Sequence, residues 1–100
     1  METTPYSFLT SPGPTTSQTP LFEWSETDND WTFWSERLTH YYLYVENENG
    51  DVVVDERQLT GLSFTSSEPL APGKYRAWVK TIFAIDIYPS WSKAIDFEVV

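Results

Sequence analysis

Hydrophobic side chains recur at every second position along much of this chain, and a period of two predicts β-strands rather than helices. The clearest example begins at Tyr41, where Tyr41, Leu43 and Val45 fall on one side of an extended chain. Tyr42 and Tyr44 fall on the opposite side, because successive side chains of a strand point to opposite faces. We therefore expect the first set to enter a core and the two intervening tyrosines to point outward.

A hairpin is predicted directly after this strand. Asn49–Gly50 has the two residue types that best tolerate the left-handed backbone of a tight hairpin turn. The return strand is predicted to cover Asp51–Arg57, which contains three consecutive valines.

A second alternating segment, Tyr75–Lys80, follows the turn-forming residues Pro69–Gly73. The residues predicted to face inward are Tyr75, Ala77 and Val79, and those predicted to face outward are Arg76, Trp78 and Lys80.

Further short strands are predicted at Leu21–Trp24, Leu62–Thr65 and Trp91–Val100, with a first apolar piece at Tyr6–Leu9. The Ser-, Thr- and Pro-rich segment Thr10–Pro20 is predicted to be a long connection that crosses from one sheet to the other. About seven short strands without a long helix predict an all-β fold, namely a two-sheet antiparallel sandwich with Greek-key connections.

Length and composition predict one domain over residues 1–100, with residues 1–5 as a flexible start. Hydrophobic residues make up 40% of the sequence, which excludes a disordered chain in spite of its charge. The sequence contains no Cys, so disulfides and Cys-based metal sites are excluded, and the packed core must supply the stability.

The formal net charge is −9, from 15 acidic and 6 basic residues. The phosphates of nucleic acid and of anionic membranes repel such a surface, so neither is an expected partner. No segment approaches the ~20 apolar residues of a transmembrane helix, so membrane insertion is not expected.

A series of aromatic and apolar motifs spans nearly the whole chain. It consists of Pro20-x-Phe22-x-Trp24, Tyr41-x-Leu43-x-Val45, Leu70-x-x-Gly73-x-Tyr75-x-Ala77-x-Val79, Trp91-Ser92 and Phe97-x-Val99. In this order and spacing the motifs resemble the fibronectin type III domain, particularly the bacterial versions found in large cell-surface and secreted proteins.

The resemblance implies that Trp24 lies at the centre of the core and that the Tyr75 hydroxyl bonds the backbone a few residues upstream, as a tyrosine corner. It also implies an extracellular or cell-surface location within a longer secreted chain, and a role as linker, adhesion module or ligand binder. In engineered binders of this family, the loops after the second strand and before the last strand are the ones that are diversified, so an engineered origin is a second interpretation. The length of the segment between Trp24 and Tyr41 departs from the family pattern.

Two loops rich in apolar residues are predicted to meet at one end of the sandwich, one after Trp24 and one before the last strand. Exposed apolar loop residues mark interaction sites, and rigid aromatic rings add contact area at low entropic cost. The residues predicted to contact a protein partner are Trp31, Phe33, Trp34, Ile85, Asp86, Ile87 and Tyr88.

A structural role for the first loop is the alternative. Asp30 is suited to cap a short helical turn, in which Trp31, Trp34 and Leu38 form one apolar stripe. Such a turn closes the open end of the core as a lid.

A second candidate surface consists of Tyr42, Tyr44 and Trp78, which are predicted to project outward from neighbouring strands of one sheet. A flat row of aromatic rings stacks on sugars or on another protein. The alternative is ordinary cross-strand packing with a basic side chain over a Trp ring. The pairs concerned are Arg76 or Lys80 over Trp78 or Trp91.

No arrangement of residues suited to catalysis is recognised, so the chain is not expected to be an enzyme. His40 is the only histidine, without a second His or a Cys to hold zinc. The oxygen-bearing residues of segment 26–30 offer calcium ligands but do not match an EF-hand loop. Neither a metal nor a cofactor is expected.

Three functional hypotheses follow. The leading one is a non-catalytic binding module that presents the aromatic loop end to a protein partner. The first alternative is a structural spacer or adhesion domain that contacts neighbouring domains of a bacterial surface or secreted protein. The second alternative is a carbohydrate-binding module that uses the outward face of Tyr42, Tyr44 and Trp78.

Overall fold

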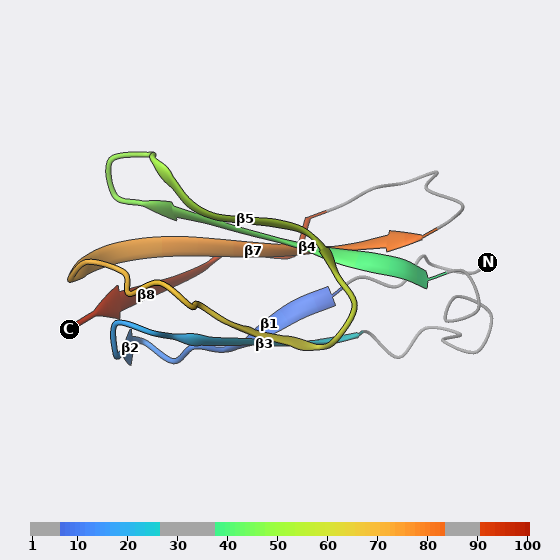
Figure 1. The fold of residues 1–100 in the computed structure, drawn as a ribbon, viewed down its shortest axis with the longest axis horizontal. Helices are drawn as coiled ribbons and strands as arrows, with labels where there is room; N and C mark the ends of the chain where they lie inside the picture. Colours follow the sequence, from blue (N-terminus) through green and yellow to red (C-terminus); the bar gives the residue numbers. More distant parts are fainter. Residues whose placement is uncertain (1–6, 27–37, 84–90) are drawn as a thin grey trace.

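The computed structural model describes residues 7–26, 38–83 and 91–100, and all regular secondary structure within these ranges is β-strand (Figure 1). The strands are β1 (Ser7–Ser11), β2 (Thr15–Thr16), β3 (Leu21–Glu26), β4 (Leu38–Asn47), β5 (Val52–Leu59), β6 (Ser63–Thr65), β7 (Gly73–Phe83) and β8 (Ile95–Val99).

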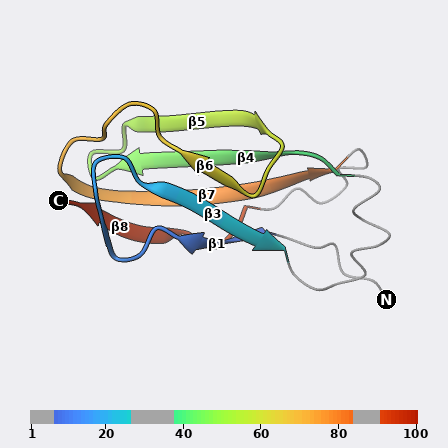
Figure 2. The ribbon, with the colours of Figure 1, turned by 60° about the horizontal axis from the view of Figure 1, so that its bottom comes forward.

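These strands form two sheets, which confirms the predicted all-β, two-sheet architecture. One sheet has the order β1-β3-β6 and the other the order β2-β8-β7-β4-β5. Figure 2 shows β1 and β3 in front of the strands of the larger sheet. All pairs are antiparallel except β2 with β8, which are parallel.

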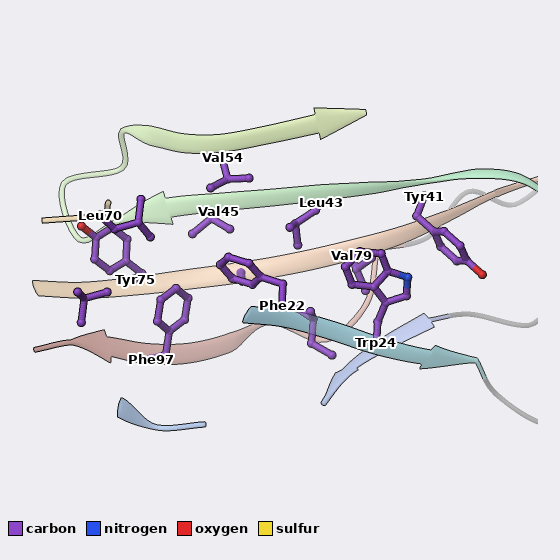
Figure 3. Close-up of a cluster of buried hydrophobic side chains, with 13 residues drawn as sticks. Phe22, Trp24, Tyr41, Leu43, Val45, Val54, Leu70, Tyr75, Val79 and Phe97 are labelled. Carbon is purple, nitrogen blue, oxygen red and sulfur yellow. The ribbon is translucent and has the colours of Figure 1, made fainter. Parts of the chain in front are cut away.

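The core lies between the two sheets and takes side chains from both (Figure 3). Phe22 of β3 meets Phe97 of β8 edge to face, with ring centroids 5.7 Å apart. Trp24 of β3 meets Tyr41 of β4 at 5.6 Å, and both are about 2% exposed. Each fully buried aromatic or aliphatic side chain stabilises the fold by roughly 1.5–3 kcal/mol relative to an exposed one.

The alternating segments behave as predicted. Every inward residue of the two segments is buried, whereas the residues between them are half-buried or exposed. The buried set is Tyr41, Leu43, Val45, Tyr75, Ala77 and Val79.

Tyr75 makes the contact that the family resemblance implies. Its hydroxyl donates a hydrogen bond of 2.6 Å to the backbone carbonyl of Ala71. Its ring stacks on Phe97 with a centroid distance of 5.5 Å. Figure 3 shows Tyr75 and Leu70 at one end of the core and Trp24 and Tyr41 at the other.

The hairpin between β4 and β5 is present, and its turn is held by Asn47. The side-chain Oδ1 of Asn47 accepts hydrogen bonds from the backbone N–H groups of Asn49 and Asp51, both 2.9 Å long. Gly50 has φ = 86°, a left-handed conformation that glycine adopts without strain.

The connection between β1 and β3 differs from the prediction. Both strands belong to the same sheet, so the segment Thr10–Pro20 does not carry the chain from one sheet to the other. Instead Thr15–Thr16 pairs with the end of β8 in the larger sheet and the chain then returns. This short excursion adds a strand beyond the seven that the pattern predicts.

The last strand is also shorter than predicted, because β8 begins at Ile95 rather than at Trp91. Trp91 makes only an isolated bridge with Lys80. The hydroxyl of Ser92 accepts a 2.9 Å hydrogen bond from the backbone N–H of Val79. A serine side chain that bonds the backbone in this way competes with a regular strand ladder.

Candidate binding surface

The outward face of the larger sheet carries a cluster of aromatic rings because four strand positions align across β4 and β7. Tyr44 lies directly opposite Trp78, and Tyr42 lies opposite Lys80. Tyr42, Tyr44 and Trp78 are half-buried. The three predicted residues therefore lie together on one face, as the alternation indicated.

Trp91 completes this cluster from the other side of β7. Its bridge with Lys80 brings the indole ring to 4.8 Å from the ring of Tyr42 and 6.0 Å from that of Tyr44, measured between centroids. Trp91 is 42% exposed. We call Tyr42, Tyr44, Trp78 and Trp91 the aromatic face.

The rings of the aromatic face pack against one another and are not coplanar. Neighbouring ring planes are inclined by 56–67°. The ammonium of Lys80 lies 5.5 Å from the centroid of Trp91, which is one of the cation–π pairs anticipated for cross-strand packing. The flat row of rings expected for sugar stacking is therefore not formed, although the exposed part of Trp91 remains accessible.

Charged residues of the edge strand β5 hold the Tyr42 ring in place. The Arg57 guanidinium lies 5.4 Å from the Tyr42 centroid and makes a 3.2 Å ion pair with Asp55. The hydrogen bonds that Arg57 donates to Asp55 lower the pKa of this carboxyl group, and the hydrogen bond from Tyr42 acts in the same direction. The hydrogen bond to Asp55 in turn raises the pKa of Tyr42.

Tyr44 is held by a different carboxylate. Its hydroxyl donates a 3.0 Å hydrogen bond to Oε1 of Glu46, two positions further along β4. This hydrogen bond is the main cause of the raised pKa of Tyr44. In both phenols of the aromatic face, a hydrogen bond to a carboxylate is thus the main cause of a raised pKa.

A hollow of about 610 Å³ continues the same face beyond the aromatic rings, over the beginning of β7. Arg76 lies two positions before Trp78 and pairs with Asp96 at 2.7 Å. Lys74 lies opposite Glu98 in the next row of the sheet. The residues that line the hollow are Pro14, Glu46, Asn47, Glu48, Gly50, Lys74, Tyr75, Arg76, Asp96, Phe97 and Glu98.

No protein-family model and no curated protein matches this chain. The assignment of a function therefore depends on the chemistry of the surfaces that the described residues form.

The residues predicted to form the aromatic loop end lie outside the described residues. They are Trp31, Phe33, Trp34, Ile85, Asp86, Ile87 and Tyr88. Two strand positions next to these segments are described. Leu38 at the start of β4 pairs with Phe83 at the end of β7. Leu38 belongs to a strand, so the predicted helical stripe does not extend to it.

The edge strand β5 is poorly suited to accept a further strand from a partner. Its pairing with β4 has two irregularities, one next to Val45 and one between Tyr41 and Leu43. Its middle, Asp55–Arg57, is exposed and charged. Bulges and charged side chains are the usual means by which edge strands avoid pairing with other chains.

The described residues contain neither a membrane-spanning helix nor a cluster of metal-ligating side chains. No helix in this part of the chain is long and apolar enough to cross a membrane. No group of three or more His, Cys, Asp or Glu side chains there is arranged to hold a metal ion.

Proposed function

We propose that this chain is a non-catalytic carbohydrate-binding module, and that it binds glycans on the aromatic face of its five-stranded sheet. The observation that carries the proposal is Trp91, which is 42% exposed yet held against Tyr42 and Lys80. A solvent-exposed indole that is fixed before binding loses little side-chain entropy when a ligand covers it.

The chemistry of a sugar ring matches this surface. The C–H groups of a pyranose carry slight positive charge and are attracted to the negative face of an aromatic ring. The hydroxyl groups at the edge of the sugar need hydrogen-bond partners, which carboxylates and guanidinium groups supply. Asp55 and Arg57 on one side and Glu46 on the other place such groups beside the rings. Because the rings are inclined, we expect them to contact the sugar mainly through Trp91.

The same proposal includes a fibronectin type III-like fold with Greek-key connections. In support, β3 and β4, β5 and β6, and β6 and β7 are consecutive in the chain but lie in different sheets. The Tyr75 hydroxyl bonds the carbonyl of Ala71, four residues upstream. We extend the proposal to an extracellular or cell-surface location within a longer chain, since that is where the resembling bacterial domains occur.

Retention on polysaccharides tests the proposal. We would incubate the protein with insoluble cellulose, chitin and xylan, and run it in native gels that contain soluble starch or mixed-linkage β-glucan. The decisive variant is Trp91→Ala. Its control is Phe8→Ala, because Phe8 is 40% exposed but belongs to β1 in the other sheet.

The expected result is retention or retardation by at least one polysaccharide, lost in Trp91→Ala and kept in Phe8→Ala. The proposal is wrong if none of the five polysaccharides binds the parent protein. It is also wrong if the two variants behave alike.

A protein partner at the loop end is the second candidate function. The pairing of Leu38 with Phe83 favours it, because both predicted loops then depart from adjacent points of one sheet. The test is a triple variant, Trp31→Ser, Phe33→Ser and Trp34→Ser, compared with the parent in urea. If the three aromatic side chains are exposed, the free energy of unfolding should change little. If they are buried, it should fall by roughly 3–5 kcal/mol for each ring. A large loss would favour a lid on the core and, with it, the spacer role.

A further inference from the structure

The hollow beside the aromatic face shares a strand with it. Trp78 and Lys80 belong to the aromatic end of β7, and Arg76 and Lys74 follow on the same outward side toward the hollow. Alternate residues of a strand are about 7 Å apart, so the face extends for roughly 20 Å from Lys80 to Lys74. That length accommodates several sugar rings in a row.

The hollow offers donors and acceptors in pairs. Arg76 and Asp96 form an ion pair whose side chains are 58% and 68% exposed. Lys74 and Glu98 are opposite each other on β7 and β8 and both are exposed. Among the described residues, no ion pair joins Lys74 to Glu98. Their ammonium and carboxylate groups are therefore open to a ligand.

Sugar hydroxyls are complementary to such pairs. A hydroxyl group both donates and accepts a hydrogen bond, so two adjacent hydroxyls of a sugar ring satisfy an ammonium and a carboxylate together. The N–H and C=O of a peptide group point in opposite directions and each has a single role, so a peptide backbone does not present adjacent groups of this dual kind. The hollow is thus suited to the polar edge of a sugar, whereas the aromatic face is suited to its apolar side.

The charge of the hollow restricts the class of sugar. Four carboxylates line it, those of Glu46, Glu48, Asp96 and Glu98, against the two cations Lys74 and Arg76. The whole chain has a net charge of −9. An anionic glycan, such as a polyuronic acid, meets repulsion both on approach and in the hollow.

We propose, on the basis of the carbohydrate-binding function above, that the hollow is a second subsite and that the ligand is an uncharged glycan chain spanning both. One sugar ring contacts Trp91 on the aromatic face. A later ring of the same chain places adjacent hydroxyls on the Lys74–Glu98 and Arg76–Asp96 pairs. The module therefore recognises a stretch of polymer rather than a chain end or a single sugar.

Calorimetric titration with defined oligosaccharides tests this inference. The neutral probes are cellohexaose, xylohexaose, maltohexaose and the N-acetylglucosamine hexamer, each compared with its own disaccharide. The anionic probe is the galacturonic acid hexamer. The variants are Lys74→Ala and Glu98→Ala in the hollow, and the control is Glu23→Ala, an exposed acidic residue on β3 of the other sheet.

At least one neutral hexamer should bind more tightly than its disaccharide, and the galacturonic acid hexamer should bind more weakly than that neutral one. Lys74→Ala and Glu98→Ala should each weaken the affinity for the hexamer about five-fold, which corresponds to one lost hydrogen bond. Neither variant should change the affinity for the disaccharide. Glu23→Ala should have no effect on either probe.

Failure of the subsite is distinguishable from failure of the binding function. Suppose that a neutral hexamer binds in a Trp91-dependent manner. If its affinity equals that of the disaccharide, or is the same in Lys74→Ala and Glu98→Ala as in the parent, the second subsite is wrong and binding at the aromatic face stands. Tighter binding of the anionic hexamer would overturn the charge restriction. If no probe binds at all, the carbohydrate function itself is wrong, and the subsite with it.

Discussion

The indole ring of Trp91 lies 4.8 Å from the phenol ring of Tyr42, although β7 lies between the chain segments that carry them. The two residues are connected through Lys80, which is opposite Tyr42 on one side and bridges to Trp91 on the other. The ammonium of Lys80 also lies over the Trp91 ring. The aromatic face is therefore one cross-strand unit rather than a set of separate surface residues.

Trp24 and Trp91 should respond very differently to truncation. Trp24 is 2% exposed in the core, so Trp24→Ala should lower the free energy of unfolding by about 3–5 kcal/mol. Trp91→Ala should lower the free energy of unfolding clearly less, since Trp91 is 42% exposed in the folded protein. Urea denaturation of both variants measures this. Equal losses would mean that Trp91 serves the stability of the sheet and is not reserved for a ligand.

The hydroxyl of Tyr75 should be worth about 1 kcal/mol of stability, the usual net value of such a hydrogen bond. Tyr75→Phe keeps the ring stacked on Phe97 and removes only the 2.6 Å bond to the carbonyl of Ala71. The matched control is Tyr44→Phe, whose hydroxyl bonds a side chain near the surface. The denaturation midpoint should fall more in Tyr75→Phe than in the control, and the reverse order would contradict the role given to Tyr75.

Alkaline pH should weaken the fold partly through Tyr75. Burial, and to a lesser extent the charge of Glu48, raises the pKa of Tyr75 above its usual value near 10. The folded protein then holds this proton more tightly than the unfolded chain does. The contribution is complete below pH ~10 and is lost as pH rises through the raised pKa. Midpoints measured between pH 8 and 11 should fall less steeply for Tyr75→Phe than for the parent, and parallel curves would contradict this.

Gly50 should be sensitive to replacement although nothing crowds it. Its φ of 86° is unfavourable for residues with a Cβ, so Gly50→Ala should lower the free energy of unfolding by about 1 kcal/mol or more. The control is Gly61→Ala, because Gly61 is equally uncrowded and has no positive φ. Thermal unfolding of the two variants should separate them, and similar midpoints would mean that the hairpin turn relaxes to accept alanine.

The parts of the fold that the sequence predicts best are those with local signals. Alternation alone assigns the inward and outward residues of Tyr75–Lys80, because each side chain of a strand has only two directions available. Asn49–Gly50 likewise indicates the hairpin through the conformations that these residues tolerate. The hydrogen bonds that the Asn47 side chain accepts from the turn have no comparable signal in the sequence.

Features that depend on contacts between distant segments could not be read from the pattern. The segment Thr10–Pro20 has the composition of a plain connection, yet two of its threonines pair with β8. The pattern predicts a regular strand from Trp91 onward, because it does not show that the Ser92 hydroxyl takes up a backbone hydrogen bond of β7. The hollow joins residues of three strands, a turn and the connection before β2, so the pattern predicts only the outward direction of a single lining residue such as Arg76.

The most direct test of the glycan-binding account is the response of individual tryptophan indole N–H signals in a two-dimensional ¹H–¹⁵N NMR spectrum, with the signals assigned from single Trp→Phe variants. We would titrate the protein with whichever neutral hexamer gives the highest affinity, or with all four if none is distinguished by calorimetry. The account predicts that the Trp91 and Trp78 signals shift and saturate together while the buried Trp24 signal stays in place. Shifts confined to Trp31 and Trp34, or no shift with any hexamer, would contradict it.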